Sequence, residues 1–283
     1  MFKKPSCNPG VGLNFQHHFS ADMLKNIDQF DFIEVFTEKF FIEEKDETLN
    51  QILKNIPLVL HGLDLSIGSA SPIKSEYLQK LKSVLSDTSF EWFSDHISLT
   101  HENNFEVGHL MPVKFSEENV VKISKKATEI ASLTDKPFLL ENITYYYPIP
   151  GQSMKEENFI SEILEHADCG MLLDINNLYI NSKNHNYDPI EFISKIPVDR
   201  VVEIHIAGGS FKHGMLVDTH ANSVSIEVWD LFDEVCRRVP FNSVIIERDS
   251  NLNKLDDLID EVNIAKQIMK KNGVYKNKIR KRL

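Results

Sequence analysis

Cysteine is scarce in this chain of 283 residues. There are three, Cys7, Cys169 and Cys236, and none has the Cys-x-x-Cys spacing. An odd number of widely separated cysteines argues against a disulfide framework and against a zinc site built from thiolates. We therefore expect any metal ion in this protein to be held by nitrogen and oxygen atoms.

Long apolar runs and an excess of positive charge are also missing. No apolar run approaches the roughly 20 residues that span a bilayer, and the opening MFKKPSCNPG lacks the apolar core of a signal peptide. We therefore expect a cytoplasmic protein with no membrane segment. The net charge of −11 repels phosphate backbones, and the basic cluster lies in the tail. Nucleic acid is therefore not an expected partner.

Short apolar runs alternate with amphipathic segments, and no linker rich in serine and glycine divides the chain. Strand-like runs occupy residues 10–15, 30–36, 57–63, 90–98, 136–142, 169–176, 200–208 and 242–249. Helical patterns occupy residues 21–29, 47–56, 74–88, 116–133, 156–167, 188–196, 224–239 and 255–271. This alternation predicts an α/β fold, a (β/α)8 TIM barrel, as a single domain over residues 1–283. We expect its core at about residues 10–262 and a basic C-terminal tail at about 274–283.

A histidine or a carboxylate stands near the C-terminal end of six successive predicted strands. Three more polar side chains follow them, one just after the sixth strand and two in an Asp-x-His motif after the seventh. In chain order the nine are His61, His96, Glu141, Asp174, Asn177, His205, Asp218, His220 and Glu247. The C-terminal ends of barrel strands form the face where barrel enzymes build their sites. We therefore expect all nine side chains to converge on one mouth.

Metal ions give an economical reason for this convergence. Four carboxylates buried together without cations would cost several kcal/mol each or would take up protons. Nine ligands exceed the three or four that a single centre uses, so the pattern predicts two or three ions, with Glu141 as a bridging carboxylate. Imidazole and carboxylate ligands suit zinc, manganese or iron, and composition does not choose among them.

Other polar residues are expected near the same mouth. Asp249 lies two residues after Glu247, on the same face of the strand, and is the candidate for a catalytic base or for a residue that orients a ligand. Substrate contacts are expected from Asn14, His17, His18, His109 and His213. The tyrosines at 145–147 either pack over a substrate or anchor their loop. Surface positions are expected for His101, His166 and His185, which lie in polar stretches.

Several stretches of this chain resemble a known family. The stretches are GVGLNFQHH, LHGLDLSIGSASP, FSDHIS, GHLMPVKFSEE, LLEN, GMLLDINNLYINS, EIHIAG, DTH and IERD. They are similar to the multinuclear non-heme iron-dependent oxidative enzymes, a family within the xylose isomerase/endonuclease IV-like TIM barrels that includes the oxidase of methanobactin biosynthesis. The likeness covers about residues 10–262.

This resemblance implies a barrel with two or three iron ions, Fe²⁺ or Fe³⁺, that uses O2 as co-substrate to oxidise a cysteine in a ribosomally synthesised precursor peptide. It also implies a small partner protein that binds the leader peptide. By matched motifs, three ligand sets are implied: His61, His96 and Glu141; Glu141, Asp174, His205 and Glu247; and Asn177, Asp218 and His220. Glu141 would then act in catalysis as the bridge between two ions.

The chain departs from the family pattern at two places. The family often has Glu-Asn-Tyr after the second strand, where this chain has Glu-Lys-Phe at 38–40. Many relatives have Glu-Trp-Asp near the end of the barrel, whereas this chain has Glu-Arg-Asp at 247–249, as the methanobactin branch does. The subfamily, and with it the product, stays open.

Three other functions are compatible with parts of the pattern. A zinc or manganese phosphodiesterase of the endonuclease IV type would use the same nine ligands to activate water, but the acidic balance and the amide of Asn177 argue against it. A divalent-metal sugar isomerase or epimerase usually needs a base beside the sugar, and no lysine in a late strand suggests one. A peptide-pathway adaptor with a vestigial site is disfavoured by the intact ligand set.

Overall fold

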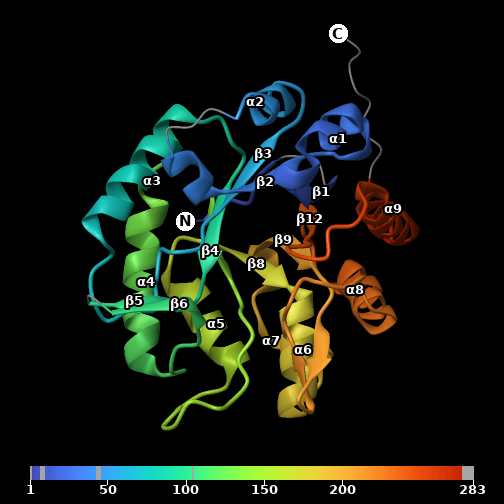
Figure 1. Cartoon of the computed structure of the whole chain (residues 1–283). Helices are drawn as coiled ribbons and strands as arrows, with labels where there is room; N and C mark the ends of the chain where they lie inside the picture. The colour runs from blue at the N-terminus through green and yellow to red at the C-terminus, as the bar shows by residue number, and fades with distance from the viewer. Residues whose placement is uncertain (1, 7–9, 43–45, 104, 276–283) are drawn as a thin grey trace.

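Eight parallel strands close into a barrel (Figure 1) in the computed structural model, which describes residues 2–6, 10–42, 46–103 and 105–275. The strands are β1 (Gly10–Asn14), β2 (Ile33–Phe36), β3 (Leu58–His61), β4 (Phe93–His96), β7 (Phe138–Glu141), β8 (Gly170–Asp174), β9 (Val201–Ile206) and β12 (Ser243–Ile246). Their order around the barrel is β1-β12-β9-β8-β7-β4-β3-β2. The predicted (β/α)8 barrel is therefore confirmed. Cys7 and most of the predicted basic tail lie outside the described residues.

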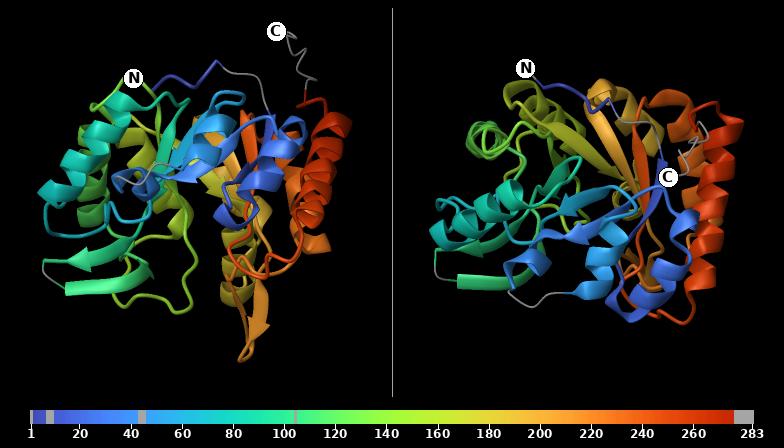
Figure 2. Two further views of the ribbon diagram at one scale, coloured as in Figure 1. Left: turned by 45° about the horizontal axis from the view of Figure 1, so that its top comes forward. Right: turned by 90° about the horizontal axis from the view of Figure 1, so that it is seen from above.

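Helices cover the outside of the barrel (Figure 2). They are α1 (Ser20–Lys25), α2 (Glu47–Leu53), α3 (Ser75–Asp87), α4 (Glu117–Ala131), α5 (Glu156–His166), α6 (Ile175–His185), α7 (Pro189–Lys195), α8 (Ile226–Arg238) and α9 (Leu255–Lys271). Short 3-10 helices lie at η1 (His17–Phe19), η2 (Ile27–Gln29), η3 (Thr37–Phe41) and η4 (Val198–Arg200). The red α9 packs beside β1 and β12. Among the described residues, no helix has both the length and the apolar character to cross a membrane.

Two of the segments that follow barrel strands contain small hairpins. β5 (Leu99–Glu102) pairs with β6 (Phe105–Met111), and β10 (Ser210–Lys212) pairs with β11 (Met215–Val217), each pair antiparallel. Both hairpins follow barrel strands, so they stand on the same side of the barrel as the predicted site. The segment 143–155, between β7 and α5, has no helix or strand.

The strand predicted at 169–176 is shorter in the structure. β8 ends at Asp174, and α6 begins at the next residue. The Asp174 carboxylate accepts a hydrogen bond from the backbone N–H of Asn177 at 2.7 Å, which caps the helix. An apolar run followed by Asp-Ile-Asn-Asn does not reveal this turn, because periodicity marks the boundary of an element poorly.

Inside the barrel, each strand changes from apolar to polar along its length. Residues two apart on a strand point to the same face. The apolar layer contains Phe32, Val59, Trp92, Leu139, Leu172, Val202 and Ile245, with Phe2 packed against it. Four of its members stand two residues before predicted ligands: Val59 before His61, Leu139 before Glu141, Leu172 before Asp174, and Ile245 before Glu247. The apolar layer is therefore a closed floor for the polar mouth.

Gly208 allows the end of β9 to lie close to the loop that carries residues 218–220. Its carbonyl oxygen accepts a hydrogen bond from the Ala221 N–H at 3.2 Å. A Cβ atom on Gly208 would lie 2.0 Å from the backbone oxygen of Asn222, which is far inside normal contact. The backbone of this loop would therefore have to move to admit any side chain.

We expect Gly208→Ala to lower the free energy of unfolding by about 1–3 kcal/mol, the usual cost of overpacking a filled position. Urea unfolding followed by circular dichroism measures the change. Ser223→Ala, at an exposed position of the same loop, is the control and should stay within about 0.5 kcal/mol of the unchanged protein. Equal stability of all three proteins would refute the close approach.

Candidate metal centre

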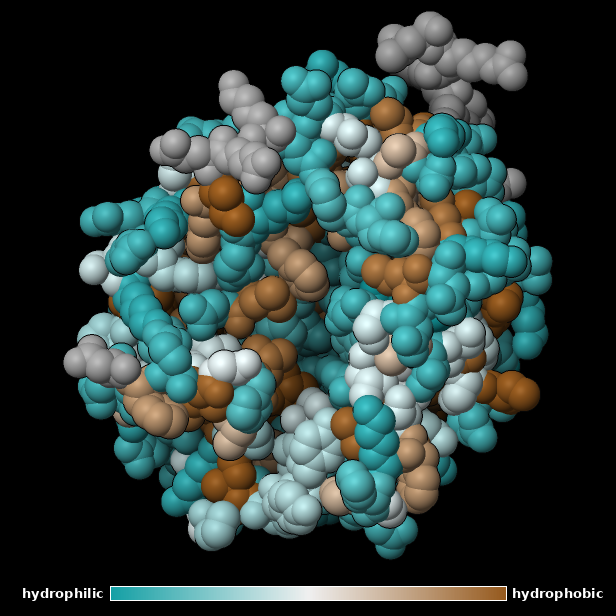
Figure 3. All heavy atoms as spheres, in the orientation of Figure 1, coloured by the Kyte–Doolittle hydropathy of each residue, from teal (hydrophilic) through white to brown (hydrophobic). Residues whose placement is uncertain are grey.

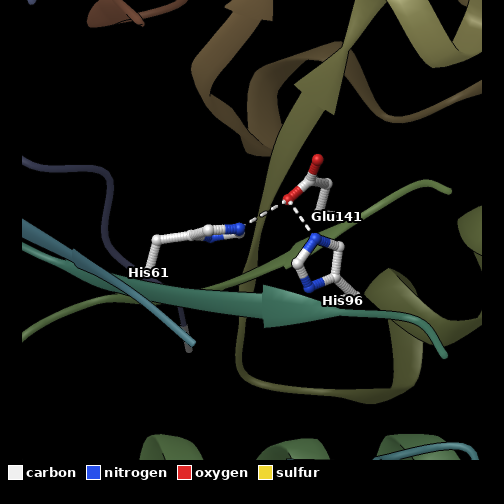
Figure 4. Close-up of side chains that lie close together, drawn as sticks. All are labelled: His61, His96 and Glu141. Carbon is white, nitrogen blue, oxygen red and sulfur yellow. Dashed lines mark ion pairs between the residues drawn. The ribbon is translucent and has the colours of Figure 1, made fainter. Parts of the chain in front are cut away.

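Two histidines and a glutamate from neighbouring strands meet at the mouth of the barrel (Figure 4). His61, His96 and Glu141 are the last residues of β3, β4 and β7. Glu141 Oε2 lies 3.4 Å from His61 Nε2 and 3.3 Å from His96 Nε2. All three side chains are buried. Their facing atoms surround a space that one metal ion can share.

A hydrogen-bond chain determines which nitrogen of His61 faces this space. The hydroxyl of Ser94 donates its proton to the Leu60 carbonyl oxygen at 3.2 Å. It can therefore only accept from His61 Nδ1, which lies 2.8 Å away. The proton of the neutral imidazole is then on Nδ1, and the lone pair of Nε2 points toward Glu141. This arrangement prepares His61 to act as a metal ligand.

Two further groups of side chains share carboxylates with the first. Glu141, Asp174 and His205 form the second group, and Asp174, His220 and Glu247 form the third. In each group the ligand atoms lie within 4.8 Å of one another. Glu247 Oε2 lies 3.1 Å from His205 Nδ1 and 3.5 Å from His220 Nδ1. Glu141 and Asp174 thus join the three groups into one ligand cluster.

Several buried atoms of the ligand cluster make no hydrogen bond to any described residue. They are Glu141 Oε2, Asp174 Oδ2, Asn177 Oδ1, His205 Nδ1 and His220 Nε2. The last two face carboxylate oxygens at 3.1 Å and 2.8 Å, respectively, without hydrogen-bond geometry. Most buried polar atoms in proteins are hydrogen-bonded, so a set of five at one place calls for a partner. Carboxylate and amide oxygens together with imidazole nitrogens suit divalent transition metals. The residues present therefore fit bound metal ions.

Without cations, protons on the histidines and carboxylates compensate the charges of the cluster. Burial raises the pKa of Glu141 to about 7, although His96 and His205 act to lower it. Burial also raises the pKa of Asp174 well above its usual range, and the neighbouring Glu141 adds to this effect. For His96 burial lowers the pKa, but the carboxylates of Glu141 and Asp95 outweigh it and bring the value to about 9. Bound cations would take the place of these protons.

The remaining predicted ligands, Asp218 and Asn177, lie beside the third group, and so does Asp249. Asp218 Oδ1 lies 2.8 Å from His220 Nε2. Asp249 Oδ2 lies 3.0 Å from His220 Nδ1, and Asp249 Oδ1 accepts a hydrogen bond from Asn14 Nδ2 at 3.2 Å. Asn177 follows Asp174 in the first turn of α6. The structure therefore brings all nine predicted ligands to one region, while their division among ions stays a prediction.

Two buried glutamates below the cluster were absent from the predicted site. Glu34 Oε2 in β2 lies 3.0 Å from His205 Nε2. An ionised Glu34 accepts a hydrogen bond from Nε2–H, so Nδ1, which lies 3.1 Å from Glu247 Oε2, is the nitrogen that would bind a metal ion after it loses its proton. Glu203 Oε2 accepts from Trp92 Nε1 at 2.7 Å, and burial raises its pKa to about 8. A lone glutamate in each of the apolar runs FDFIEVF and VVEIHI was the signal that could have identified them.

A cavity of about 820 Å³, the central cavity, opens above the ligand cluster. Ligands such as His61 and Glu247 form its floor, and the segments 109–112 and 143–150 supply mostly apolar walls. In Figure 3 the molecule is hollowed near the middle of the face shown, and brown apolar residues border the hollow on its left. A pocket with apolar walls and a few convergent polar groups is typical of a binding site. A short segment of a larger substrate would fit it.

The residues predicted to contact substrate occupy different places. His109 lines the central cavity, together with all three tyrosines of the 145–147 run. His17 and His18 are exposed on η1, and His213 is exposed between β10 and β11. These three and the buried Asn14 are not among the described residues that line the cavity. Substrate contact at these positions stays a prediction.

The surface position predicted for two other histidines is wrong. His101 is 2% exposed, and its Nδ1 lies 3.6 Å from Asp64 Oδ1. His185 is half-buried because its ring stacks on Tyr145, with ring centroids 4.2 Å apart. His166 is exposed, as predicted. Polar neighbours in the sequence conceal burial that arises from distant segments.

We expect Glu141→Ala to abolish metal binding at two positions together, because its carboxylate belongs to both the first and the second group. Elemental analysis of variant and unchanged protein purified in parallel gives the number of ions per chain. Glu118→Ala, which removes an exposed carboxylate from α4, should keep the full number. A Glu141 variant with undiminished metal content would exclude the bridging role.

We expect Glu34→Gln to weaken metal binding by about tenfold or more, since partners that orient a ligating histidine typically contribute 10–100-fold to affinity. Competition with a coloured chelator measures the affinity. The matched control is Glu47→Gln, at an exposed position of the following helix. Identical affinities for the two variants would show that Glu34 does not orient His205.

Solved structures share the fold at low sequence identity. The 3-keto-D-glucoside 4-epimerase YcjR from E. coli superimposes with a TM-score of 0.61 and 13% identity, over 92% of this chain and 100% of that chain. A D-psicose 3-epimerase solved with D-fructose gives a TM-score of 0.59 and 11% identity, over 92% of this chain and 99% of the other. At such identities the likeness concerns the fold alone.

Relatives by sequence span almost the whole chain. A UPF0276 protein of Caulobacter vibrioides (strain NA1000 / CB15N) is 34% identical over 260 residues, covering 91% of this chain and 93% of the relative. A UPF0276 protein of Anaeromyxobacter sp. (strain Fw109-5) is 33% identical over 261 residues, covering 92% of each. The family described as "RiPP precursor modification enzyme MbnB/TglH/ChrH", where RiPP denotes a ribosomally synthesised and post-translationally modified peptide, matches residues 10–270. This chain therefore belongs to the MbnB/TglH/ChrH family of RiPP precursor modification enzymes.

Proposed function

We propose that this protein is an oxidase that uses O2 and two or three iron ions to modify a cysteine of a ribosomally synthesised precursor peptide. Its family membership supports a precursor peptide as substrate. The observation that carries the proposal is the sharing of Glu141 and Asp174 among three ligand groups. Shared carboxylates hold metal ions side by side, which suits a multinuclear site.

The ligand groups indicate where the ions would lie. Three sets would each hold one ion: His61, His96 and Glu141; Glu141, Asp174 and His205; and Asp174, His220 and Glu247, with Asn177 and Asp218 beside the third. This assignment differs from that implied by the resemblance, because Glu247 joins His220 here. Iron, when bound, would supply redox chemistry and a place where the substrate thiolate and O2 meet. Cys169 and Cys236 are buried and belong to none of the sets, so the thiolate would come from the substrate.

The side chains around the cluster would position the substrate. The apolar walls of the central cavity would hold a peptide segment and exclude water from the cluster. The substrate thiol must lose its proton before it binds a metal ion. Asp249 lines the cavity and is hydrogen-bonded to His220 and Asn14. We propose that Asp249 either accepts this proton or holds the orientation of His220.

A small partner protein that binds the leader peptide is part of the proposal. The central cavity accommodates only a short segment of a precursor, so the rest of the peptide needs another surface. We propose that both proteins act in the cytoplasm, where the precursor is synthesised.

The test uses the iron-loaded protein and a cysteine-containing precursor peptide encoded beside its gene. In air we expect a mass change at the cysteine, with O2 accepting the electrons that the peptide loses. The change should be absent without O2, absent with the Cys→Ser peptide, and lost in the Glu141→Ala variant but not in Glu118→Ala. Mass spectrometry with fragmentation locates the change.

Two results would contradict this function. One is the same mass change in the absence of O2 or in the Cys→Ser peptide. The other is cleavage of an abasic DNA duplex at low concentrations of the zinc-loaded protein, which would favour a phosphodiesterase that uses the ligand cluster to activate water.

A further inference from the structure

A second pocket of about 350 Å³ lies outside the ligand cluster. It is formed by the loop after β7, the first turn of α5 and the connection between α6 and α7. We call it the side pocket, and its walls include Tyr145, Gln152, Glu156, His185, Tyr187 and Phe192. None of these residues belongs to the ligand cluster. Tyr145 also lines the central cavity.

Aromatic rings form much of the side pocket. Tyr145 stacks on His185 with centroids 4.2 Å apart and planes 17° from parallel. Tyr187 stacks on Phe192 with centroids 6.1 Å apart and planes 21° from parallel. The faces of aromatic rings attract cations, and more strongly where water is excluded.

One carboxylate of the side pocket is buried without a cation. Glu156 is 6% exposed, and its Oε2 makes no hydrogen bond to any described residue. Burial raises its pKa to about 8, although Tyr145 and Tyr187 act to lower it. The nearby Lys195 is engaged elsewhere, with its Nζ 2.6 Å from Glu191 and 3.2 Å from Glu157. Lys155 also lines the pocket, and its Nζ lies 4.0 Å from Glu157 Oε1. The pocket therefore presents a carboxylate and aromatic rings, and no ion pair between described residues joins Lys155 or Lys195 to Glu156.

The side pocket is close to the ligand cluster along the chain. Tyr145 follows Glu141 by four residues, a span of at most about 14 Å in extended backbone. Ile143 of the central cavity, Glu156 of the side pocket and Tyr145 of both also line one small void. An extended peptide held over the ligand cluster would cover this span in about four residues.

We propose that the side pocket binds the basic side chain of a lysine or arginine in the precursor peptide, within about four residues of the residue that is modified. The occupant would bring the cation that Glu156 lacks and would pack between the aromatic rings. That the cation belongs to a peptide rests on the proposed function. That the pocket prefers a cation rests on Glu156 and the aromatic rings alone.

The first experiment tests the preference for a cation with the full-length, metal-loaded protein. Saturation-transfer NMR titrations use Nα-acetyl-arginine amide, Nα-acetyl-lysine amide and the neutral Nα-acetyl-citrulline amide as probes. We expect at least one of the basic probes to bind at least tenfold more tightly than citrulline, and Glu156→Gln to weaken that binding by tenfold or more. Glu165→Gln, at an exposed position of the same helix, should change it by less than twofold. Equal binding of citrulline and both basic probes, or unchanged binding in Glu156→Gln, would overturn the inference.

The second experiment tests whether the cation belongs to the peptide. Replacing the lysine or arginine nearest to the modified cysteine with glutamine should raise KM at least tenfold in the unchanged enzyme and leave kcat within about twofold. In Glu156→Gln the same peptide change should have little further effect, because the pair has already been broken. Independent effects of the two changes would show that the pocket takes a free cation and would overturn the peptide assignment. A peptide that is not modified at all would contradict the proposed function, while the first experiment would still decide the pocket's preference.

Discussion

The burial of carboxylates at one end of the barrel is the constraint on which the rest of the site depends. Glu141, Asp174 and Glu247 are almost completely removed from water at the ends of three different strands. An ionised carboxylate in such a place is unstable unless a cation or a proton accompanies it. The raised pKa values of Glu141 and Asp174 express this instability. The site is therefore organised to accept positive charge. The rest of the fold offsets the free-energy cost of burying these carboxylates.

The groups below the predicted ligands would direct how bound cations are coordinated. Ser94 and Glu34 each accept a ring N–H, from His61 and from His205 respectively, and so turn the opposite nitrogen toward the cluster. Asp174 divides its two oxygens between tasks, because Oδ1 caps α6 while Oδ2 faces the cluster. Such partners hold ligands in position before any ion binds. The apolar layer beneath them keeps water away from these hydrogen bonds.

The loop after β7 joins the ligand cluster to both pockets. It begins directly after Glu141, forms one wall of the central cavity and, through Tyr145, also a wall of the side pocket. Tyr145 is held by Asn181, whose side-chain oxygen accepts its backbone N–H at 3.1 Å, and by its stacking on His185. A substrate bound along this loop is therefore placed relative to a rigid strand end. This is how barrel enzymes combine one scaffold with many specificities.

Local sequence pattern and tertiary contacts determine different features of this protein. The alternation of apolar and amphipathic runs was enough to predict all eight barrel strands. The polar residues at six strand ends, with three more just after two of these strands, were enough to predict which side chains converge. Both follow from short-range periodicity, and a parallel barrel necessarily gathers the C-terminal ends of its strands. The capping of α6 by Asp174 and the hairpins at the mouth are boundary features that periodicity does not resolve.

The roles of Glu34, Glu156 and His101 were decided only by the tertiary structure. Glu34 is separated from its partner His205 by 171 residues, and Glu156 appears in the sequence as one more acidic residue at a helix start. His101 is buried although its neighbours in the sequence are polar. The sequence gives the charge type of a side chain. Its exposure to water and its partner depend on distant segments that meet when the barrel closes. The sequence by itself therefore determined the barrel and the ligands it gathers, and the closed fold decided their partners.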